Sequence, residues 1–230
     1  MNEMSRKCVP YTPFERELAD TVVGIVGAVG VHRRDQEPFP TEDPGGIDYR
    51  AIAADTVLTD LVISHHHYDH SDADTDPNIV LPIETLRELA AAGVIAAPAD
   101  RHFSYGFTTR LRELYEETFP KLVRDIERSK ADAVIVTAGC PGVCHRSAVT
   151  LQRAIEMRGI ATVAITVSPD NTLAMRPPRA LCPEGFALGR VVGPPRARAV
   201  HRAVVQAALG LLAAEVRPGR VVKQRFAAEP

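Results

Sequence analysis

The chain of 230 residues contains no tryptophan, and only 5% of its residues are aromatic. Surfaces that stack nucleic-acid bases are built from aromatic side chains, so the composition argues against such a surface. The net charge of −2 lacks the basic excess of a nucleic-acid-binding protein. No apolar run reaches the roughly 18 residues that a membrane-spanning helix needs. We therefore expect neither nucleic acid nor membrane as a partner.

Cysteine is also scarce, with four residues at Cys8, Cys140, Cys144 and Cys182. A chain of this size with so few cysteines does not resemble a secreted scaffold held together by disulfides. The opening residues, MNEMSRKCVP, lack the apolar segment of a secretory signal peptide. A cytoplasmic location is the resulting expectation, and Cys8 and Cys182 are expected to be small buried hydrophobic residues.

Hydrophobic residues make up 45% of the chain and charged residues 24%, which is the balance of a globular protein. Apolar, β-branched runs predict strands at residues 21–31, 56–63, 133–137 and 161–166. The last two flank a predicted helix at 147–157, and a βαβ unit implies parallel strands. We expect one α/β domain over residues 1–230, a parallel sheet flanked by helices in Rossmann-like or flavodoxin-like layers, with long Pro-rich loops.

Helical spacing of apolar residues predicts further helices at 82–93, 109–128 and 197–214, with Pro120 kinking or dividing the second. The apolar face of the last helix predicts either packing inside the domain or a contact between two copies of the chain. A homo-oligomer is therefore one of two possible interpretations. Stretches rich in Pro, at 32–46 and 169–195, are interpreted as functional loops.

Two cysteines stand in the stretch TAGCPGVCHRS, between the strand predicted at 133–137 and the following helix. Ligands bind at the carboxyl edge of a parallel sheet, and the amino end of a helix lowers the pKa of a thiol there. Cys144 lies four residues after Cys140, close enough to form a disulfide with it if the loop permits. A plain turn that carries two cysteines is the alternative. A structural zinc site is less favoured, because no second cysteine pair completes four ligands.

Four histidines crowd the stretch VISHHHYDHSDAD. Its pattern matches the zinc signature of the metallo-β-lactamase hydrolases through His65, His67, Asp69 and His70. The βαβ pattern downstream is unlike the strand-rich sandwich of those enzymes. A solvated polar loop is a second interpretation, and a polar substrate pocket that donates protons or hydrogen bonds is the favoured one.

Three stretches in order, GVHRRDQEPF, ISHHHYDHSDADTDPNIVLPIETLRELAAAGVI and AVIVTAGCPGVCHRS, resemble the selenoprotein B family of the glycine, sarcosine, betaine and D-proline reductases. The resemblance runs from about residue 30 to 212 and is stronger to the D-proline reductase branch. It implies that Cys140 takes the position of the selenocysteine, that Cys144 is the resolving thiol, and that His145 is a nearby acid or orienting group.

The family implies reductive cleavage of a C–N bond, or another C–heteroatom bond, in a small amino-acid-like substrate. The pocket is then expected to include His32, His65, His67, Tyr68 and Asp69. No cofactor is expected in this chain; the resemblance implies a pyruvoyl group on a partner subunit. A thioredoxin-like or other thiol electron donor is a further expectation from the thiol chemistry. Cysteine in place of selenocysteine is a poorer nucleophile and leaving group, which predicts slower turnover or a different substrate.

Three other functions stay open. The first is the zinc-dependent hydrolase that would use His65, His67, Asp69 and His70. The second is a cofactor-independent racemase-like enzyme, in which paired thiols move an α-proton. The third is a non-catalytic binding subunit that keeps the family fold without the chemistry.

Overall fold

The computed structural model describes residues 8–226, so the interpretation of the opening residues falls largely outside the described part of the chain. An eight-stranded sheet crosses the molecule in the order β10-β9-β8-β7-β1-β6-β3, with β5 beside β1. The paired strands are parallel except for β3, which is antiparallel to β6. The strands are β1 (Val22–Ala28), β3 (Tyr49–Ala53), β5 (Ala97–Pro98), β6 (Arg101–Tyr105), β7 (Ala133–Ala138), β8 (Ala161–Ile165), β9 (Ala180–Pro183) and β10 (Val222–Gln224).

The central strands are apolar because helices cover both faces of the sheet. Every residue of β7 and β8 is buried, and so is every residue of β1 after Val22. Parallel strands that are buried on both faces show such continuous hydrophobic runs instead of alternation. The mostly parallel α/β sheet predicted from the sequence is confirmed.

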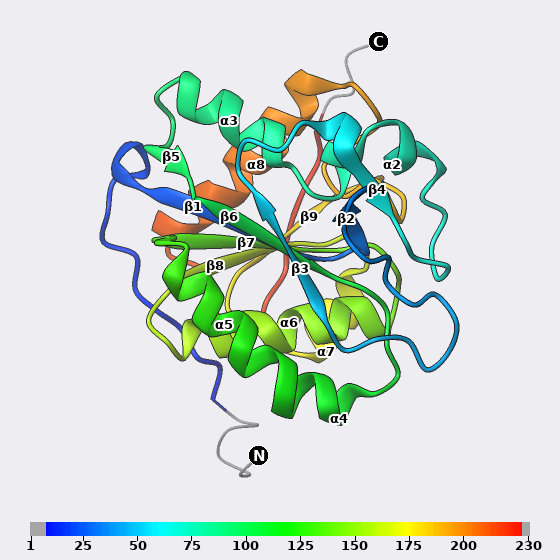
Figure 1. Ribbon diagram of the computed structural model, residues 1–230. Helices are drawn as coiled ribbons and strands as arrows, with labels where there is room; N and C mark the ends of the chain where they lie inside the picture. The colour runs from blue at the N-terminus through cyan, green and yellow to red at the C-terminus, as the bar shows by residue number, and fades with distance from the viewer. Residues whose placement is uncertain (1–7, 227–230) are drawn as a thin grey trace.

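Figure 1 shows the helices in two layers, one on each face of the sheet. One layer holds α3 (Ile83–Ala91) and α8 (Arg198–Ala213). The other holds α4 (Leu111–Glu113), the π-helical turn η4 (Leu114–Thr118), α5 (Phe119–Arg128), α6 (Val143–Glu156) and α7 (Pro169–Ala174). One face of α8, which includes Val200, Val204 and Leu209, is buried, and the helix packs against β8 and β9, so this apolar face is used internally.

A smaller unit lies beyond the carboxyl end of β1 (Figure 1). Strands β2 (Val31–Arg33) and β4 (Leu61–Ile63) form an antiparallel pair, and α2 (Ser71–Thr75) and the 3₁₀ turn η3 (Pro77–Ile79) follow. Two further 3₁₀ turns, η1 (Leu18–Asp20) and η2 (Leu58–Asp60), precede β1 and β4. The histidine-rich segment connects β4 to α2 and therefore starts at this end of the sheet.

Some predicted boundaries differ from the structure. The single strand predicted at 21–31 is divided into β1 and β2 at Gly30, where φ is +70° and a Cβ would lie 2.4 Å from the carbonyl oxygen of Ser64. The predicted helix at 109–128 runs without a break from Leu111 to Arg128 as α4, η4 and α5, and its π-helical turn η4 lies directly before Phe119 and Pro120. The loop predicted at 169–195 contains α7 and β9.

Among the described residues, no helix combines the length and the apolar character that crossing a membrane would require.

Candidate active site

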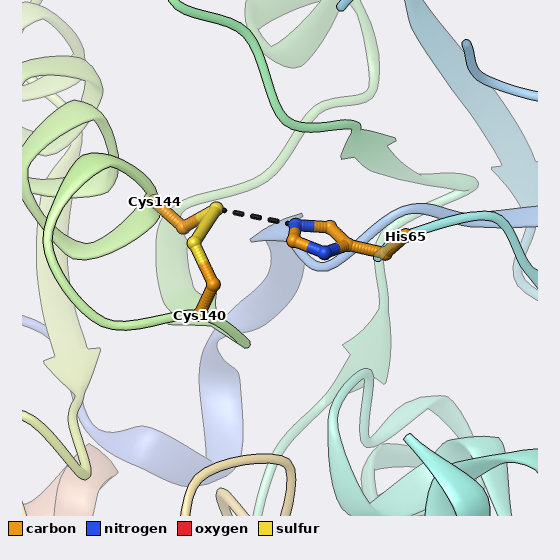
Figure 2. Close-up of side chains that lie close together, drawn as sticks. All are labelled: His65, Cys140 and Cys144. Atoms are coloured by element: carbon orange, nitrogen blue, oxygen red, sulfur yellow. Dashed lines mark hydrogen bonds between the residues drawn. A yellow bond between two sulfur atoms is a disulfide. The ribbon is translucent and has the colours of Figure 1, made fainter. Parts of the chain in front are cut away.

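Cys140 and Cys144 lie together at the carboxyl edge of the sheet. The strand β7 ends at Ala138, Cys140 follows two residues later, and Cys144 is in the first turn of α6. The two residues form a disulfide, with their Cα atoms 5.5 Å apart (Figure 2). Only 1% of each residue is exposed to solvent. The structure thus holds the oxidised form of a buried thiol pair at the amino end of a helix.

Two glycines shape the turn that carries the pair. Gly142 has φ +70° directly before α6, a conformation that residues with a side chain rarely adopt. Gly139 lies under the ring of Tyr68, and a Cβ there would be 2.4 Å from Cε1 of that ring. This second glycine lets the chain pass beneath the aromatic ring just before Cys140.

His65 is the histidine that meets the sulfur atoms. Its Nε2 lies 3.3 Å from Sγ of Cys144 (Figure 2), and its Nδ1 accepts a hydrogen bond of 3.1 Å from the backbone N–H of His67. The residue is 1% exposed, and the ring of Tyr68 tilts over it at a centroid distance of 4.7 Å. The segment after β4 thus brings an imidazole from a distant part of the sequence onto the thiol pair.

The two thiols have opposite electrostatic environments when the pair is reduced. A hydrogen bond from Cys144 is the largest influence on Cys140; together with a hydrogen bond from His65 it lowers the pKa of the Cys140 thiol despite burial. Burial is the largest influence on Cys144 and raises the pKa of its thiol well above the ordinary value. Cys140 is therefore the sulfur that ionises more easily.

His145 has a different position from the one expected of an acid beside the sulfur. Its Nδ1 bonds the carbonyl oxygen of Cys140 at 2.6 Å, and its Nε2 is buried without a hydrogen-bond partner. Burial lowers the pKa of His145 to about 4, so the ring is neutral near pH 7. The side chain holds the backbone of the cysteine turn and leaves one buried acceptor unused.

A pocket of about 340 Å³ lies over the histidine-rich segment, lined by His65, His66, Tyr68, Asp69, His70, Ser71 and Asp74. His65 both lines this pocket and contacts Cys144, so one residue connects the pocket with the thiol pair. Asp69 is exposed, and its carboxylate accepts a hydrogen bond from the backbone N–H of Ser71. His67 stacks on Phe107, with ring centroids 3.5 Å apart.

Two residues expected in the pocket have their polar atoms occupied by the protein. The phenol of Tyr68 donates a hydrogen bond of 2.8 Å to the carbonyl oxygen of Val29. The imidazole of His32 bonds the carbonyl oxygen of Arg33 through Nδ1 and the hydroxyl of Ser64 through Nε2, both at 2.8 Å. Tyr68 reaches the pocket with its ring, whereas His32 ties β2 to the end of β4.

The four side chains of the zinc signature face different partners. His70 bonds Asp74, His67 lies 3.8 Å from a carboxylate oxygen of Asp43, and His65 faces Cys144. Among the described residues, the group with ligand atoms close enough to share one ion is instead His65, Cys140 and Cys144. In the structure these two sulfur atoms are bonded to each other.

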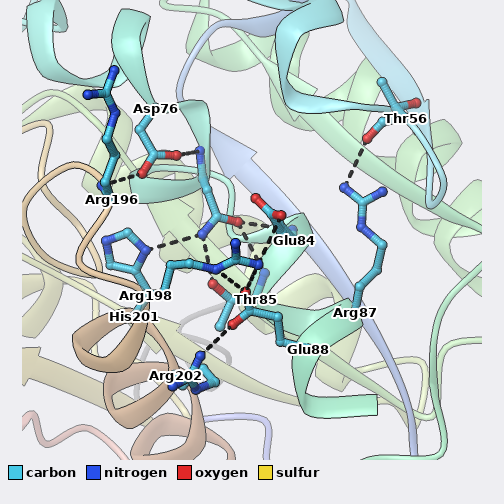
Figure 3. Close-up of polar contacts among 11 residues, drawn as sticks. Thr56, Asp76, Glu84, Thr85, Arg87, Glu88, Arg196, Arg198, His201 and Arg202 are labelled. Carbon is cyan, nitrogen blue, oxygen red and sulfur yellow. Dashed lines mark hydrogen bonds and ion pairs between the residues drawn. The ribbon is translucent and has the colours of Figure 1, made fainter. Parts of the chain in front are cut away.

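A buried polar network follows the histidine-rich segment (Figure 3). Oδ1 of Asn78 accepts hydrogen bonds from the backbone N–H groups of Glu84 and Thr85, at 3.0 and 3.2 Å. Its Nδ2 donates to Oγ1 of Thr85 at 2.8 Å and to Nδ1 of His201 at 3.3 Å. The Nε2 of His201 then bonds the carbonyl oxygen of Pro194 at 2.7 Å. This network, here called the Asn78 network, joins η3, α3 and α8.

Sequence reasoning missed the loop that covers the histidine-rich segment. Gly189 packs against this segment, where its Cβ would lie 2.5 Å from the carbonyl oxygen of Asp69. The N–H of Val192 bonds the carbonyl oxygen of Ile79, and Arg190 pairs with Asp72. A glycine in a Pro-rich stretch was the available signal, but it does not say which distant segment the loop contacts.

Comparison with curated proteins finds clear relatives. The chain is 35% identical to D-proline reductase subunit gamma of Acetoanaerobium sticklandii over 213 residues, covering 92% of this chain and 86% of that subunit. It is 27% identical to glycine reductase complex component B subunit gamma of Symbiobacterium thermophilum and 29% identical to sarcosine reductase complex component B subunit beta of Peptoclostridium acidaminophilum. Each of those two matches covers 70% of this chain but only 38% of the longer relative.

No family model matches the chain, and no solved structure matches it. The resemblance predicted from the three sequence stretches is confirmed by the curated relatives, which are subunits of amino-acid reductases.

Proposed function

We propose a function from one premise: this chain belongs to the selenoprotein B family of the D-proline, glycine, sarcosine and betaine reductases. It would act as a thiol-dependent reductase subunit that cleaves a C–N bond, or another C–heteroatom bond, in a small amino-acid-like substrate. Cys140 would be the nucleophile and Cys144 the resolving thiol.

One observation carries the proposal: Cys140 and Cys144 form a disulfide at the start of α6, beside His65. A reductase that takes two electrons from a pair of thiols leaves that pair oxidised to a disulfide at the end of the reaction. The pair also has the asymmetry that the reaction needs, since the pKa is lowered at Cys140 and raised at Cys144. The thiolate, not the thiol, is the attacking species.

The proposed reaction has two steps. The Cys140 thiolate first attacks the substrate carbon, a C–S bond forms, and the C–N electron pair leaves with the nitrogen, which takes a proton. The Cys144 thiolate then attacks the Cys140 sulfur and forms the disulfide. The C–S electron pair stays on the substrate carbon, which takes a proton. Two thiols are oxidised to one disulfide, and the substrate carbon is reduced by two electrons.

The first step requires a nitrogen that can leave with the C–N electron pair, and an unactivated amine is a poor leaving group. We therefore propose that the carbonyl of a pyruvoyl group on a partner subunit condenses with the substrate amine and makes its nitrogen a better leaving group. In the second step, the carboxylate of an amino-acid-like substrate lies beside the carbon that takes the C–S electron pair. A thiol electron donor, such as a thioredoxin-like protein, would reduce the disulfide for the next turnover.

Burial of the pair favours one alternative, a binding subunit without chemistry. Both cysteines are 1% exposed, and neither lines the pocket, whereas His65, which contacts Cys144, does. Turnover therefore requires side chains around the thiol pair to move so that a substrate can reach Cys140. The racemase alternative has less support, because two thiols joined to each other cannot stand on opposite sides of a substrate.

The decisive experiment compares cysteine variants in the complete reductase complex, with D-proline as the substrate and dithiothreitol as the electron donor. We expect Cys140→Ser and Cys144→Ser each to lose activity by about 1000-fold or more, as loss of a nucleophile does in other enzymes. Cys8→Ser is the control: this cysteine is exposed and outside the disulfide, and its variant should keep full activity. An active Cys140→Ser complex of unchanged stability would overturn the proposal in favour of the binding subunit.

A further inference from the structure

We propose that His65 is a fixed, neutral hydrogen-bond donor that stabilises the thiolate form of Cys144. The inference rests on the proposed function, because it assigns a role in making and opening the disulfide. It differs from an acid–base role: His65 would hold a partial positive charge against the sulfur without giving up its proton.

The argument starts at the far side of the imidazole ring. Nδ1 of His65 lies 3.1 Å from the backbone nitrogen of His67, in the geometry of a hydrogen bond. A backbone N–H can only donate, so Nδ1 must accept through its lone pair and carries no hydrogen. A neutral imidazole has one ring hydrogen, which must then be on Nε2. This nitrogen is the one that lies 3.3 Å from Sγ of Cys144.

The same contact opposes the charged imidazolium. Protonation of Nδ1 would place its hydrogen against the N–H of His67, in a ring that is 1% exposed to solvent. It also opposes a zinc ion on Nε2, since a neutral ring bound through Nε2 carries its hydrogen on Nδ1. The donor arrangement is therefore the one that satisfies both nitrogens at once.

Cys144 is the sulfur that needs such a donor. In the second step of the proposed reaction Cys144 must attack as a thiolate, and in the reverse direction, when a thiol reductant attacks Cys140, the S–S bond breaks and its electron pair leaves on Cys144. Because Cys140 has the lower pKa and is otherwise the easier sulfur to release, this direction of opening depends on a donor at Cys144. Burial disfavours that anion, as the raised pKa of Cys144 shows. The Nε2–H of His65 points at this sulfur before the charge develops. It would stabilise the thiolate in the same way as the hydrogen-bond donors of an oxyanion hole stabilise a developing negative charge on oxygen.

Two substitutions separate the donor role from an acid–base role. His65→Gln keeps a side-chain N–H but cannot change its protonation state, whereas His65→Leu has no N–H. The isolated full-length chain, in its disulfide form, would be reduced by dithiothreitol between pH 6 and 9 and its thiol release followed in time. Lys121→Ala is the control, because Lys121 is exposed on α5 and does not line the pocket.

We expect His65→Leu to slow reduction by at least about 10-fold, since one donor to a developing oxyanion is worth roughly 100-fold and sulfur is a weaker acceptor. His65→Gln should stay within a few-fold of the unmodified chain at every pH, and Lys121→Ala should match the unmodified chain. A His65→Gln chain as slow as His65→Leu would overturn the donor role and indicate proton transfer. A His65→Leu chain reduced at the normal rate would leave His65 without a role in this step.

A second measurement does not depend on any substitution. Nitrogen-15 NMR of the histidine rings distinguishes a nitrogen that carries hydrogen from one that does not. We expect Nε2 of His65 to carry the ring hydrogen and Nδ1 to carry none at pH 8; the reverse tautomer would overturn the inference. Both experiments use the chain without substrate, so they can fail or succeed independently of the turnover test with Cys140→Ser.

Discussion

His65 and His201 are two buried histidines, each 1% exposed, in two regions that use the ring differently. In the Asn78 network, both nitrogens of His201 bond an amide and a carbonyl of the protein, and neither partner can change chemically. In the thiol site, one nitrogen of His65 bonds the backbone and the other faces a sulfur that can be oxidised or reduced. Burial alone therefore does not distinguish a structural histidine from a reactive one; the partner of the second nitrogen does.

The difference extends to the surroundings of each ring. The Asn78 side chain uses its oxygen and its nitrogen fully, in four hydrogen bonds. The thiol site leaves Nε2 of His145 buried and unpaired. An unpaired buried acceptor costs stability, which a protein retains more readily at a functional site than in a structural core. We expect the two regions to respond differently to acid, to loss of a side chain and to added bulk.

Lowering the pH should cause the largest loss of folding stability, and part of this loss arises in the thiol site. Burial lowers the pKa of His145 to about 4 and that of His102, on β6, to about 3, against about 6.5 in an unfolded chain. Because the unfolded chain binds these protons first, stability is complete above pH 6.5 and falls as the pH drops toward 4. Each histidine would remove about 3 kcal/mol over that range, at about 1.4 kcal/mol per pH unit.

Urea unfolding of the disulfide form at pH 6.5, 6.0, 5.5 and 5.0 would measure this slope. His145→Gln should remove about half of it and leave the part due to His102. A free energy of unfolding that does not change over this range would contradict the neutral, buried state of both rings.

Loss of the Asn78 side chain tests the other region. Asn78→Ala leaves the N–H groups of Glu84 and Thr85 without their acceptor and His201 without its donor. We expect a loss of about 3 kcal/mol, since each buried group left unpaired costs roughly 1–3 kcal/mol. The rate at which dithiothreitol reduces the disulfide should stay the same in the folded protein. A change in that rate without a change in stability would show that the two regions are coupled.

Added bulk at Gly139 should have a smaller effect, confined to the thiol site. The new Cβ of Gly139→Ala would lie 2.4 Å from the buried ring of Tyr68, whose hydroxyl is held by Val29. We expect a loss of about 2 kcal/mol from overpacking, together with an altered rate of disulfide reduction, because the same ring packs on His65. Gly142→Ala is the control for backbone strain alone: it has φ +70° but nothing within 4 Å of its Cβ, and should cost about 1 kcal/mol. Equal effects of the two substitutions would argue against the contact with Tyr68.

The sequence predicted the parts of the fold whose pattern is local. The runs that became β7 and β8 are apolar except for one threonine each, and the predicted ends of α3, α6 and α8 lie within one to four residues of the observed ends. Strand β6 was missed because its residues, RHFSY, include polar side chains that are buried in the structure, such as His102 and Ser104. Their burial depends on the strands beside them, which local pattern does not reveal.

The candidate site was predictable in its residues more than in its contacts. The spacing of Cys140 and Cys144 predicted that a disulfide could form, and the structure contains it. The contact between His65 and Cys144 joins residues 79 positions apart and depends on how β4 meets the sheet. Sequence proximity favoured His145 as the histidine beside the sulfur, whereas the helix turn directs its Nδ1 to the carbonyl of Cys140. Because α6 begins at Val143, four residues before the predicted start, His145 is already part of the helix.

The bond that fixes the tautomer of His65 comes from the main chain of residue 67, not from a side chain. Nineteen of the twenty amino acids supply that N–H equally well, and proline alone does not. A substitution at position 67 therefore leaves the hydrogen bond to the ring of residue 65 intact, as long as the backbone conformation is unchanged. The imidazole at position 65 has no such freedom, so over generations the histidine codons at positions 65 and 67 would change at very different rates.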